Sequence, residues 1–221
     1  MSLVQMDILG SPNLGVYCYA NDHVCLVPRG LNERKMRRIE ECLGVKTYQA
    51  TVAGSILLGV FIAGNSYGIL LPRIVEEDEL KFIKEVCDVK VKVLHVKWTA
   101  IGNMMVVNDK GGLIDPSAPR GLVSEVSRTL EIPVERGRIS GLTYVGSLSV
   151  ATSKGALTHP KIRFEEKVKL ERVLGVESEA CTVNSGVPFP KSGVLANSKG
   201  AVVGSLTSGA EKAVIANVLQ V

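Results

Sequence analysis

The feature that most constrains the fold of this chain is an internal repeat of 44 residues. Four prolines follow one another at this interval, and one further interval ends at a glycine: Pro28, Pro72, Pro116, Pro160 and Gly204. Five such units account for nearly all of the 221 residues. A unit of this size cannot bury its apolar residues alone, so the units are expected to pack against one another.

Each unit contains a similar segment that predicts a β-hairpin. The first reads LGVYCYANDHVCLVP, the second LGVFIAGNSYGILLP, the third IGNMMVVNDKGGLIDP, the fourth VGSLSVATSKGALTHP and the fifth SGVLANSKGAVVG. Two short apolar runs flank a polar turn, and the closing proline ends the second strand. The constant interval predicts one polar column through the turns: Asn21, Asn65, Asp109, Ser153 and Asn197.

A helix and a further strand complete each unit. In the first unit Asn32 is expected to cap the helix and Gly44 to end it, and in the last unit Ser208 and Glu211 form a capping box. Valines alternate with lysines over residues 89–93, which predicts a half-exposed strand before the next hairpin.

These units predict one domain over residues 1–221, a five-fold pseudosymmetric α/β propeller. No polar capping repeat is visible at either end, which favours a closed ring over an open solenoid. The predicted units cover approximately residues 1–44, 45–86, 87–131, 132–175 and 176–221.

The composition is typical of a folded cytoplasmic protein. Hydrophobic residues make up 46% and charged residues 22%, which excludes disorder as the main state. The unbroken apolar segment 56–64 is too short for a membrane-spanning helix, and the N-terminus has no basic start followed by an apolar core. The five cysteines form no C-x-x-C pair, so reduced, mostly buried thiols are favoured over disulfides.

The repeat also accounts for the one segment that matches a catalytic sequence motif. Gly64–Gly68 matches G-x-S-x-G, but that motif requires a helix after the turn, whereas the other units have a hairpin at this position. The histidines and cysteines show no metal-ligand spacing, and no phosphate-binding loop is present. We therefore expect no catalytic residue, no metal and no cofactor. A thiolate pair of Cys181 with a histidine is the less favoured alternative.

The charge distribution allows contact with nucleic acid without requiring it. The net charge is +4 at pH 7, and the densest basic cluster is Arg34–Arg38. We interpret this cluster first as the solvent-facing side of an amphipathic helix. Contact with ribosomal RNA or another acidic surface is the alternative.

Three segments resemble a known family. They are TAIGN with its NDKG turn (residues 99–111), VGS followed by SKGxLTHP (residues 145–160), and ANSKGAVVGSLTSGAE (residues 196–211). They are similar to the translation initiation factor 6 family in its short archaeal form, and the five repeats resemble the pentein architecture. One departure is Ser208-Gly-Ala210, where Thr-Gly-Pro is expected; only the first turn of the last helix should change.

The resemblance implies a ribosomal role and no catalysis. Family members bind the large (50S) ribosomal subunit and sterically keep the small (30S) subunit from joining, and they act late in large-subunit maturation. The implied partners are a ribosomal protein surface with ribosomal RNA nearby, and a maturation factor with an elongation-factor-like GTPase for release. Neither a membrane nor a small-molecule substrate is implied. Regulation through the C-terminal tail of the longer eukaryotic form is not expected here.

The resemblance also implies that the first residues of the hairpins face the ribosome. The matching positions are Gly15, Gly59, Val60, Gly102, Asn103, Gly146 and Ser147. Asn103 is the strongest candidate, because a polar residue there departs from the apolar pattern. The alternative is that the glycines only permit close packing around the ring. An enzyme acting on a guanidino substrate, as among other penteins, is the alternative function, but its Cys and His constellation does not occur at matching positions.

Overall fold

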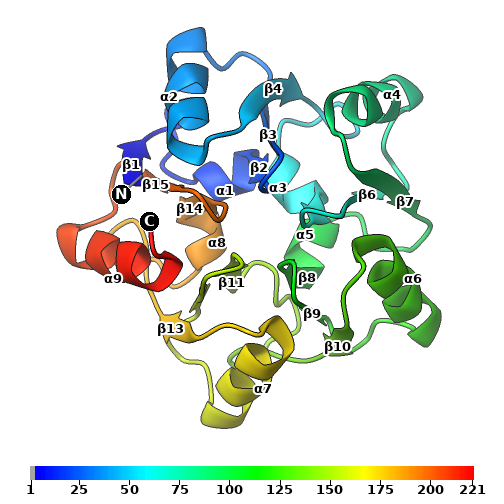
Figure 1. The fold of residues 1–221 in the computed structure, drawn as a ribbon, viewed down its shortest axis with the longest axis vertical. Helices are drawn as coiled ribbons and strands as arrows, with labels where there is room; N and C mark the ends of the chain where they lie inside the picture. The colour runs from blue at the N-terminus through cyan, green and yellow to red at the C-terminus, as the bar shows by residue number, and fades with distance from the viewer. Residues whose placement is uncertain (1–2) are drawn as a thin grey trace.

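Five small sheets surround a central axis, and a helix covers the outside of each sheet (Figure 1). The computed structural model describes residues 3–221, so the first two residues of the predicted domain lie outside the described ones. Each sheet has three strands. The predicted five-fold α/β propeller is therefore confirmed.

The first blade shows how each sheet is built. It contains α1 (Leu14–Tyr17), β2 (Tyr19–Ala20), β3 (Val24–Pro28), α2 (Glu33–Leu43) and β4 (Lys46–Ala50). Strand β2 pairs antiparallel with β3, and β4 returns beyond the helix to pair parallel with β3. The helix is thus the crossover between two parallel strands, which places it on the outer side of the blade.

The other blades follow the same plan. The second has α3 (Leu58–Phe61), β5 (Ala63–Gly64), β6 (Gly68–Pro72), α4 (Glu77–Val86) and β7 (Lys90–Leu94). The third has α5 (Ile101–Met104), β8 (Met105–Val107), β9 (Gly112–Ile114), α6 (Arg120–Leu130) and β10 (Val134–Arg136). The fourth has β11 (Ser149–Ala151), β12 (Ala156–Thr158), α7 (Phe164–Leu174) and β13 (Ser178–Ala180). The fifth has α8 (Pro190–Gly193), β14 (Val194–Ala196), β15 (Ala201–Gly204) and α9 (Gly209–Leu219).

The N-terminal strand closes the ring. Strand β1 (Leu3–Met6) pairs parallel with β15, with Leu3 opposite Ala201, and thereby supplies the third strand of the last blade. In the other blades this place is taken by the strand that follows the helix. Because the two ends of the chain meet in one sheet, neither end leaves a repeat uncovered, and the predicted closed ring is confirmed.

The hairpins differ from the prediction in their first half. In four units the segment opens with a one-turn helix (α1, α3, α5 or α8), and two or three residues then form the inner strand. In the fourth unit residues 145–147 form a turn at this place. The physical reason is contact between neighbouring units, described below, which a short period-two pattern does not reveal.

The polar column was predicted wrongly in two units. Asn65 N donates to Gly68 O, and the equivalent bonds run from Asn108 N to Gly111 O and from Thr152 N to Gly155 O. The column is therefore Asn21, Asn65, Asn108, Thr152 and Asn197, with neither Asp109 nor Ser153 in it. The extra residue of the third and fourth units lies after the second strand, directly before the proline, so the turns themselves keep their length.

The side-chain amides of this column connect neighbouring blades. Asn21 Nδ2 donates to Asn65 O (2.9 Å), Asn65 to Asn108 O (3.1 Å) and Asn108 to Thr152 O (2.9 Å). Asn197 donates to Asn21 O (3.1 Å) across the ring closure. The chain of amides is interrupted only at Thr152, whose hydroxyl bonds to Gly155 O in its own turn. All five residues are buried, so each amide satisfies backbone groups that water cannot reach.

The outer helices begin and end as predicted. The Asn32 side chain accepts from Lys35 N (2.9 Å), and Gly44 ends the helix in the left-handed conformation at φ 60°. The capping box of Ser208 and Glu211 is present at the start of α9. Apolar clusters lie between the helices and the sheets; on α2 the buried face is Ile39, Cys42 and Leu43.

The capping glutamate of α9 also joins the helix to a preceding tight turn. Its carboxylate accepts from Thr182 Oγ1 (2.7 Å), Ser208 N (2.7 Å), Gly186 N (2.9 Å) and Ser185 N (3.1 Å). Burial alone would raise the pKa of Glu211, but the hydrogen bonds from Ser208, Thr182 and Gly186 outweigh it and lower the pKa to about 2. The ionised carboxylate therefore stabilises the folded ring.

The Glu211→Gln variant is expected to lose about 2 kcal/mol of unfolding free energy at pH 7, because the amide accepts fewer of these bonds. In the wild type the contribution is complete above the ordinary glutamate range and is lost as the pH falls through about 2. The variant should therefore show a flatter stability profile between pH 5 and pH 2 in urea titrations. Glu165→Gln, at an exposed position of α7, is the control; an equal effect there would contradict the prediction.

Candidate functional site

The predicted site residues lie together at one end of the ring. Gly15, Gly59 and Gly102 lie in α1, α3 and α5, and Gly146 lies in the turn before β11. Helix α1 contacts α3 on one side and α8 on the other, and α3 contacts α5. Figure 1 shows these one-turn helices close to the axis. The repeat thus brings residues from distant parts of the sequence into one narrow circle.

The glycines of this circle are contact points between neighbouring units. A Cβ atom on Gly59 would lie closer to Gly15 O than the 3.0 Å that real Cβ atoms keep. The same holds for Gly102 against Gly59 O and for Gly146 against Gly102 O. All four glycines are buried. The geometry therefore supports a packing role for them, and a binding surface must come from the residues beside them.

The residues that directly follow the glycines are accessible. Val16, Val60, Asn103 and Ser147 are each partly exposed, and we call these four residues the ring surface. Tyr17, Phe61 and Met104, next along the chain, are also partly exposed. An uncharged surface with apolar and aromatic groups of this kind resembles the centre of a protein–protein interface more than a nucleic-acid site.

Asn103 is the residue of the ring surface whose polar side chain makes no hydrogen bond within the described residues. Its backbone is engaged, since its N–H donates to Ala100 O (3.0 Å) and its carbonyl accepts from Gly146 N (2.9 Å). Within residues 3–221 its side-chain amide makes no hydrogen bond. By contrast, Ser147 Oγ already donates to Tyr144 O (2.9 Å). Asn103 therefore presents a free donor and a free acceptor at the ring surface.

The fifth unit carries a residue that the sequence comparison of the units missed. Lys191 occupies the place of the glycine, because a Cβ on Gly15 would meet Lys191 O as the other glycines would meet their neighbours. The fifth predicted segment started at Ser192, one residue too late to include it. Aligning Pro190-Lys191 with Leu14-Gly15 would have revealed it.

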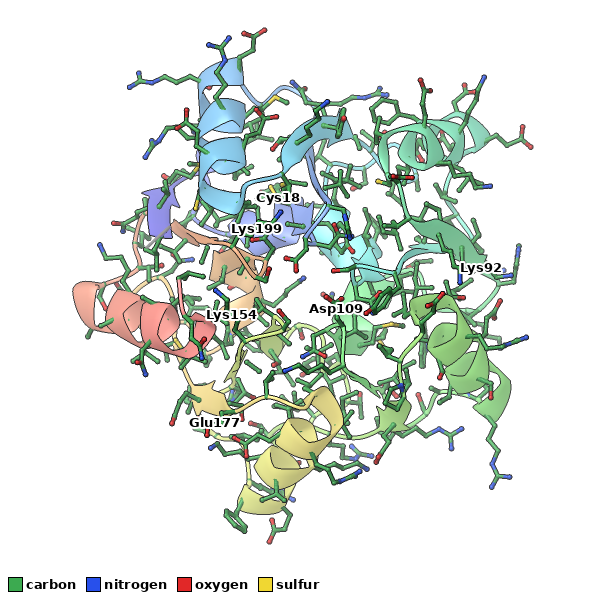
Figure 2. The ribbon with its side chains drawn as sticks, viewed as in Figure 1. Cys18, Lys92, Asp109, Lys154, Glu177 and Lys199 are labelled. Atoms are coloured by element: carbon green, nitrogen blue, oxygen red, sulfur yellow. The ribbon has the colours of Figure 1, made fainter. Side chains whose placement is uncertain are left out.

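The opposite end of the ring is occupied by contacts within the protein. It carries the hairpin turns and the C-terminal ends of the outer helices. Lys110, Lys154 and Lys199 donate to Gly175 O (3.2 Å), Gln220 O (3.0 Å) and Gly44 O (3.3 Å), which lie at the ends of α7, α9 and α2. Figure 2 shows Asp109, Lys154 and Lys199 gathered around the axis. Ammonium groups suit the negative ends of these helices, so these lysines have a structural role.

The basic cluster Arg34–Arg38 lies on α2, at the outer rim of the ring. Arg34, Arg37 and Arg38 are exposed, and Arg37 pairs with Glu33 at 3.5 Å. The opposite face of the helix is buried in the core. The amphipathic helix predicted here is confirmed, and its arginines face solvent.

The catalytic alternatives lack the required chemistry. Gly64–Gly68 forms the turn between β5 and β6, as the repeat predicted, and Ser66 Oγ donates to Asp109 Oδ2 (2.8 Å). All five cysteines are free and buried. Burial raises the pKa of Cys181 to about 12, so this thiol is not an activated nucleophile at neutral pH.

Residues 3–221 contain neither a cluster of metal ligands nor a helix that could span a membrane. No group of three or more His, Cys, Asp and Glu side chains is arranged to hold a metal ion. No helix in this range has the length and apolar character needed to cross a membrane.

Comparison with known proteins gives consistent results. A model of the eIF-6 family matches residues 3–218. The chain is 38% identical over 214 residues to translation initiation factor 6 of Staphylothermus marinus, covering 96% of this chain and 94% of the relative. It is 41% identical over 211 residues to translation initiation factor 6 of Cenarchaeum symbiosum, covering 96% of each chain.

Among solved structures, the chain is similar to a dimethylarginine dimethylaminohydrolase variant crystallised as an adduct with S-methyl-L-thiocitrulline. The TM-score is 0.51 at 10% identity, covering 75% of this chain and 68% of that chain. At this identity the likeness concerns the fold alone. The pentein architecture that the repeats resembled is thereby confirmed.

Proposed function

The chain belongs to the eIF-6 family, and from this premise we propose that it is a translation initiation factor that binds the large ribosomal subunit and prevents premature joining of the small subunit. The observation that carries this proposal is the family match over nearly the whole chain. The mechanism is steric: the rigid ring docks on the joining face of the large subunit and occupies the space that the small subunit needs. Such a role requires no catalytic residue and no cofactor.

The docking site in this proposal is the ring surface. Its apolar residues would pack against a ribosomal protein, and the free amide of Asn103 would supply a directed hydrogen bond at the centre. The surface is held by the glycine contacts of a closed ring, so little conformational entropy is lost on binding.

A basic rim on the same end would face ribosomal RNA. Strand β3 runs antiparallel to β2, so its last residue, Pro28, lies at the end of the ring that carries α1. In three units an exposed basic residue directly follows this position: Arg29, Arg73 and Lys161. Basic side chains at this rim would attract RNA phosphates, which adds salt-dependent affinity and increases the association rate.

The remaining parts of the proposal follow from the family. The protein acts in the cytoplasm during large-subunit maturation. Release is assigned to a maturation factor with an elongation-factor-like GTPase, as membership of the family implies.

Sedimentation of the protein with separated ribosomal subunits through a sucrose gradient tests the proposal. The protein should migrate with the large subunit alone, and added protein should reduce the fraction of joined ribosomes. Failure to bind at low salt, with normal joining of the subunits, would overturn it. In that case turnover of guanidino compounds, abolished by Cys181→Ala, would support the enzyme alternative.

A further inference from the structure

A cavity lies on the axis of the ring, between the five inner strands. Its volume is about 60 Å³, and residues from β2, β5, β8, β11 and β14 line it. A water molecule needs about 10–15 Å³ on this measure, so the cavity has room for a few waters or one small ion with water. Most of the lining consists of small or apolar residues such as Ala20, Gly64 and Val150.

Lys191 is the exception in this lining. It is the only charged residue among the described residues that surround the cavity. The equivalent residue in the other four units is glycine, so only the fifth unit has a side chain at this position of the circle, and Lys191 lines the cavity together with Gly102 and Gly146. An ammonium in this position carries three hydrogen-bond donors.

No protein group within residues 3–221 accepts from this ammonium. Lys191 makes no hydrogen bond and no ion pair there, and no carboxylate lines the cavity. Burial lowers the pKa of Lys191 to about 8, so the group still carries its proton at neutral pH. Lys191 as a whole is partly exposed, but its ammonium is surrounded by protein and has no acidic group beside it. An unpaired charge in such surroundings is costly, and a counter-ion in the cavity would offset that cost.

Tyr19 provides a second donor in the same cavity. Its hydroxyl oxygen accepts from Asn21 Nδ2 at 3.4 Å, while its own proton has no acceptor in the described part of the chain. Burial raises the pKa of Tyr19 far above its ordinary value, so the phenol stays neutral and does not supply a counter-charge for Lys191. Among the described residues, Tyr19 and Lys191 are the only titratable groups in the lining.

We propose that the axial cavity is a binding site for a small inorganic anion, of the size of a halide or phosphate, held by the ammonium of Lys191. Water alone would leave the positive charge uncompensated in a lining without acidic groups, whereas an anion compensates it and accepts its hydrogen bonds. None of the four ring-surface residues lines the cavity, so the proposal does not rest on the proposed ribosomal role.

Anion-dependent thermal stability tests the proposal in solution. The wild type is titrated with sodium bromide or sodium phosphate at constant ionic strength, with sodium gluconate as the replaced salt because its anion is too large for the cavity. A saturable rise in Tm is expected for at least one probe. Lys191→Met should weaken the apparent affinity at least tenfold. Lys97→Met, which removes an exposed lysine, should leave it unchanged.

Two measurements locate the ion. Crystals soaked in bromide should show an anomalous peak at hydrogen-bond distance from Lys191 Nζ. In protein labelled with ¹⁵N-lysine, the bound anion should raise the pKa of Lys191, a result that does not depend on a folded variant. Binding of equal strength in Lys191→Met would overturn the proposal, and so would a wild type with neither a saturable effect nor a peak.

Discussion

Gly59→Ala is expected to destabilise the ring by about 3 kcal/mol, at the upper end of the usual cost of overpacking. The new methyl group would collide with Gly15 O, a backbone atom of the neighbouring unit that cannot turn aside as a side chain can. Relief requires α1 and α3 to separate, which disturbs the inner strands that follow them. For a chain of this length the Tm should fall by about 10 °C in thermal unfolding followed by circular dichroism.

Gly121→Ala is the matched control for this variant. Gly121 lies in α6, and a Cβ there would meet nothing within 4 Å. The substitution removes backbone freedom from the unfolded chain and should leave stability unchanged or raise it by up to about 1 kcal/mol. If Gly59→Ala unfolded at the same temperature as Gly121→Ala, the packing role of the glycine circle would be wrong.

Some parts of this fold can be predicted from sequence, whereas the contacts between the glycines of neighbouring units cannot. The five-fold ring follows from the spacing of Pro28, Pro72, Pro116 and Pro160, because repeats without a polar cap must pack against each other. Helix ends follow from local chemistry, as at Asn32 and Gly44. The ring follows from a regular interval along the chain and the helix ends follow from neighbouring residues, so neither prediction requires a contact between units to be known.

Features that depend on where a unit carries an extra residue, or on contacts between units, could not be predicted. A constant interval placed Asp109 in the polar column, whereas the hydrogen bonds place Asn108 there. The one-turn helices were predicted as strand, because four residues are too few to distinguish the periods of helix and strand. The sequence alone does not identify Lys191 as the fifth member of the circle, because that role is defined by its contact with Gly15, which is far away in the sequence.

Within the candidate site, Asn103 shows the same difference between what the sequence predicts and what only the structure reveals. The sequence marks it as polar in an apolar segment, but a polar residue in such a place is often bonded within its own protein. The structure adds that its amide has no partner within residues 3–221. Together these observations separate Asn103 from Ser147, whose hydroxyl is already bonded to Tyr144 O.

Asn103→Ala is therefore expected to weaken binding to the large ribosomal subunit at least tenfold without lowering Tm. The tenfold loss corresponds to about 1.4 kcal/mol, the range of a residue near the centre of an interface. Stability should not change, because the variant removes no hydrogen bond that the side chain makes within the described chain. Affinity is measured by cosedimentation of labelled protein with large subunits at several concentrations, and Tm by thermal unfolding of the free protein.

Asn217→Ala provides the control, since it removes the same group from the exposed surface of α9 near its C-terminal end, at the opposite end of the ring. Its affinity for the large subunit should equal that of the wild type. Asn103→Asp keeps the size of the side chain but replaces the donor by a negative charge, so it should bind at least as weakly as Asn103→Ala. If both Asn103 variants bound like the wild type while the wild type bound the large subunit, the ring surface would be excluded as the docking site. The basic rim at Arg29, Arg73 and Lys161 would then be the next surface to test, because its contribution should weaken steeply with added salt.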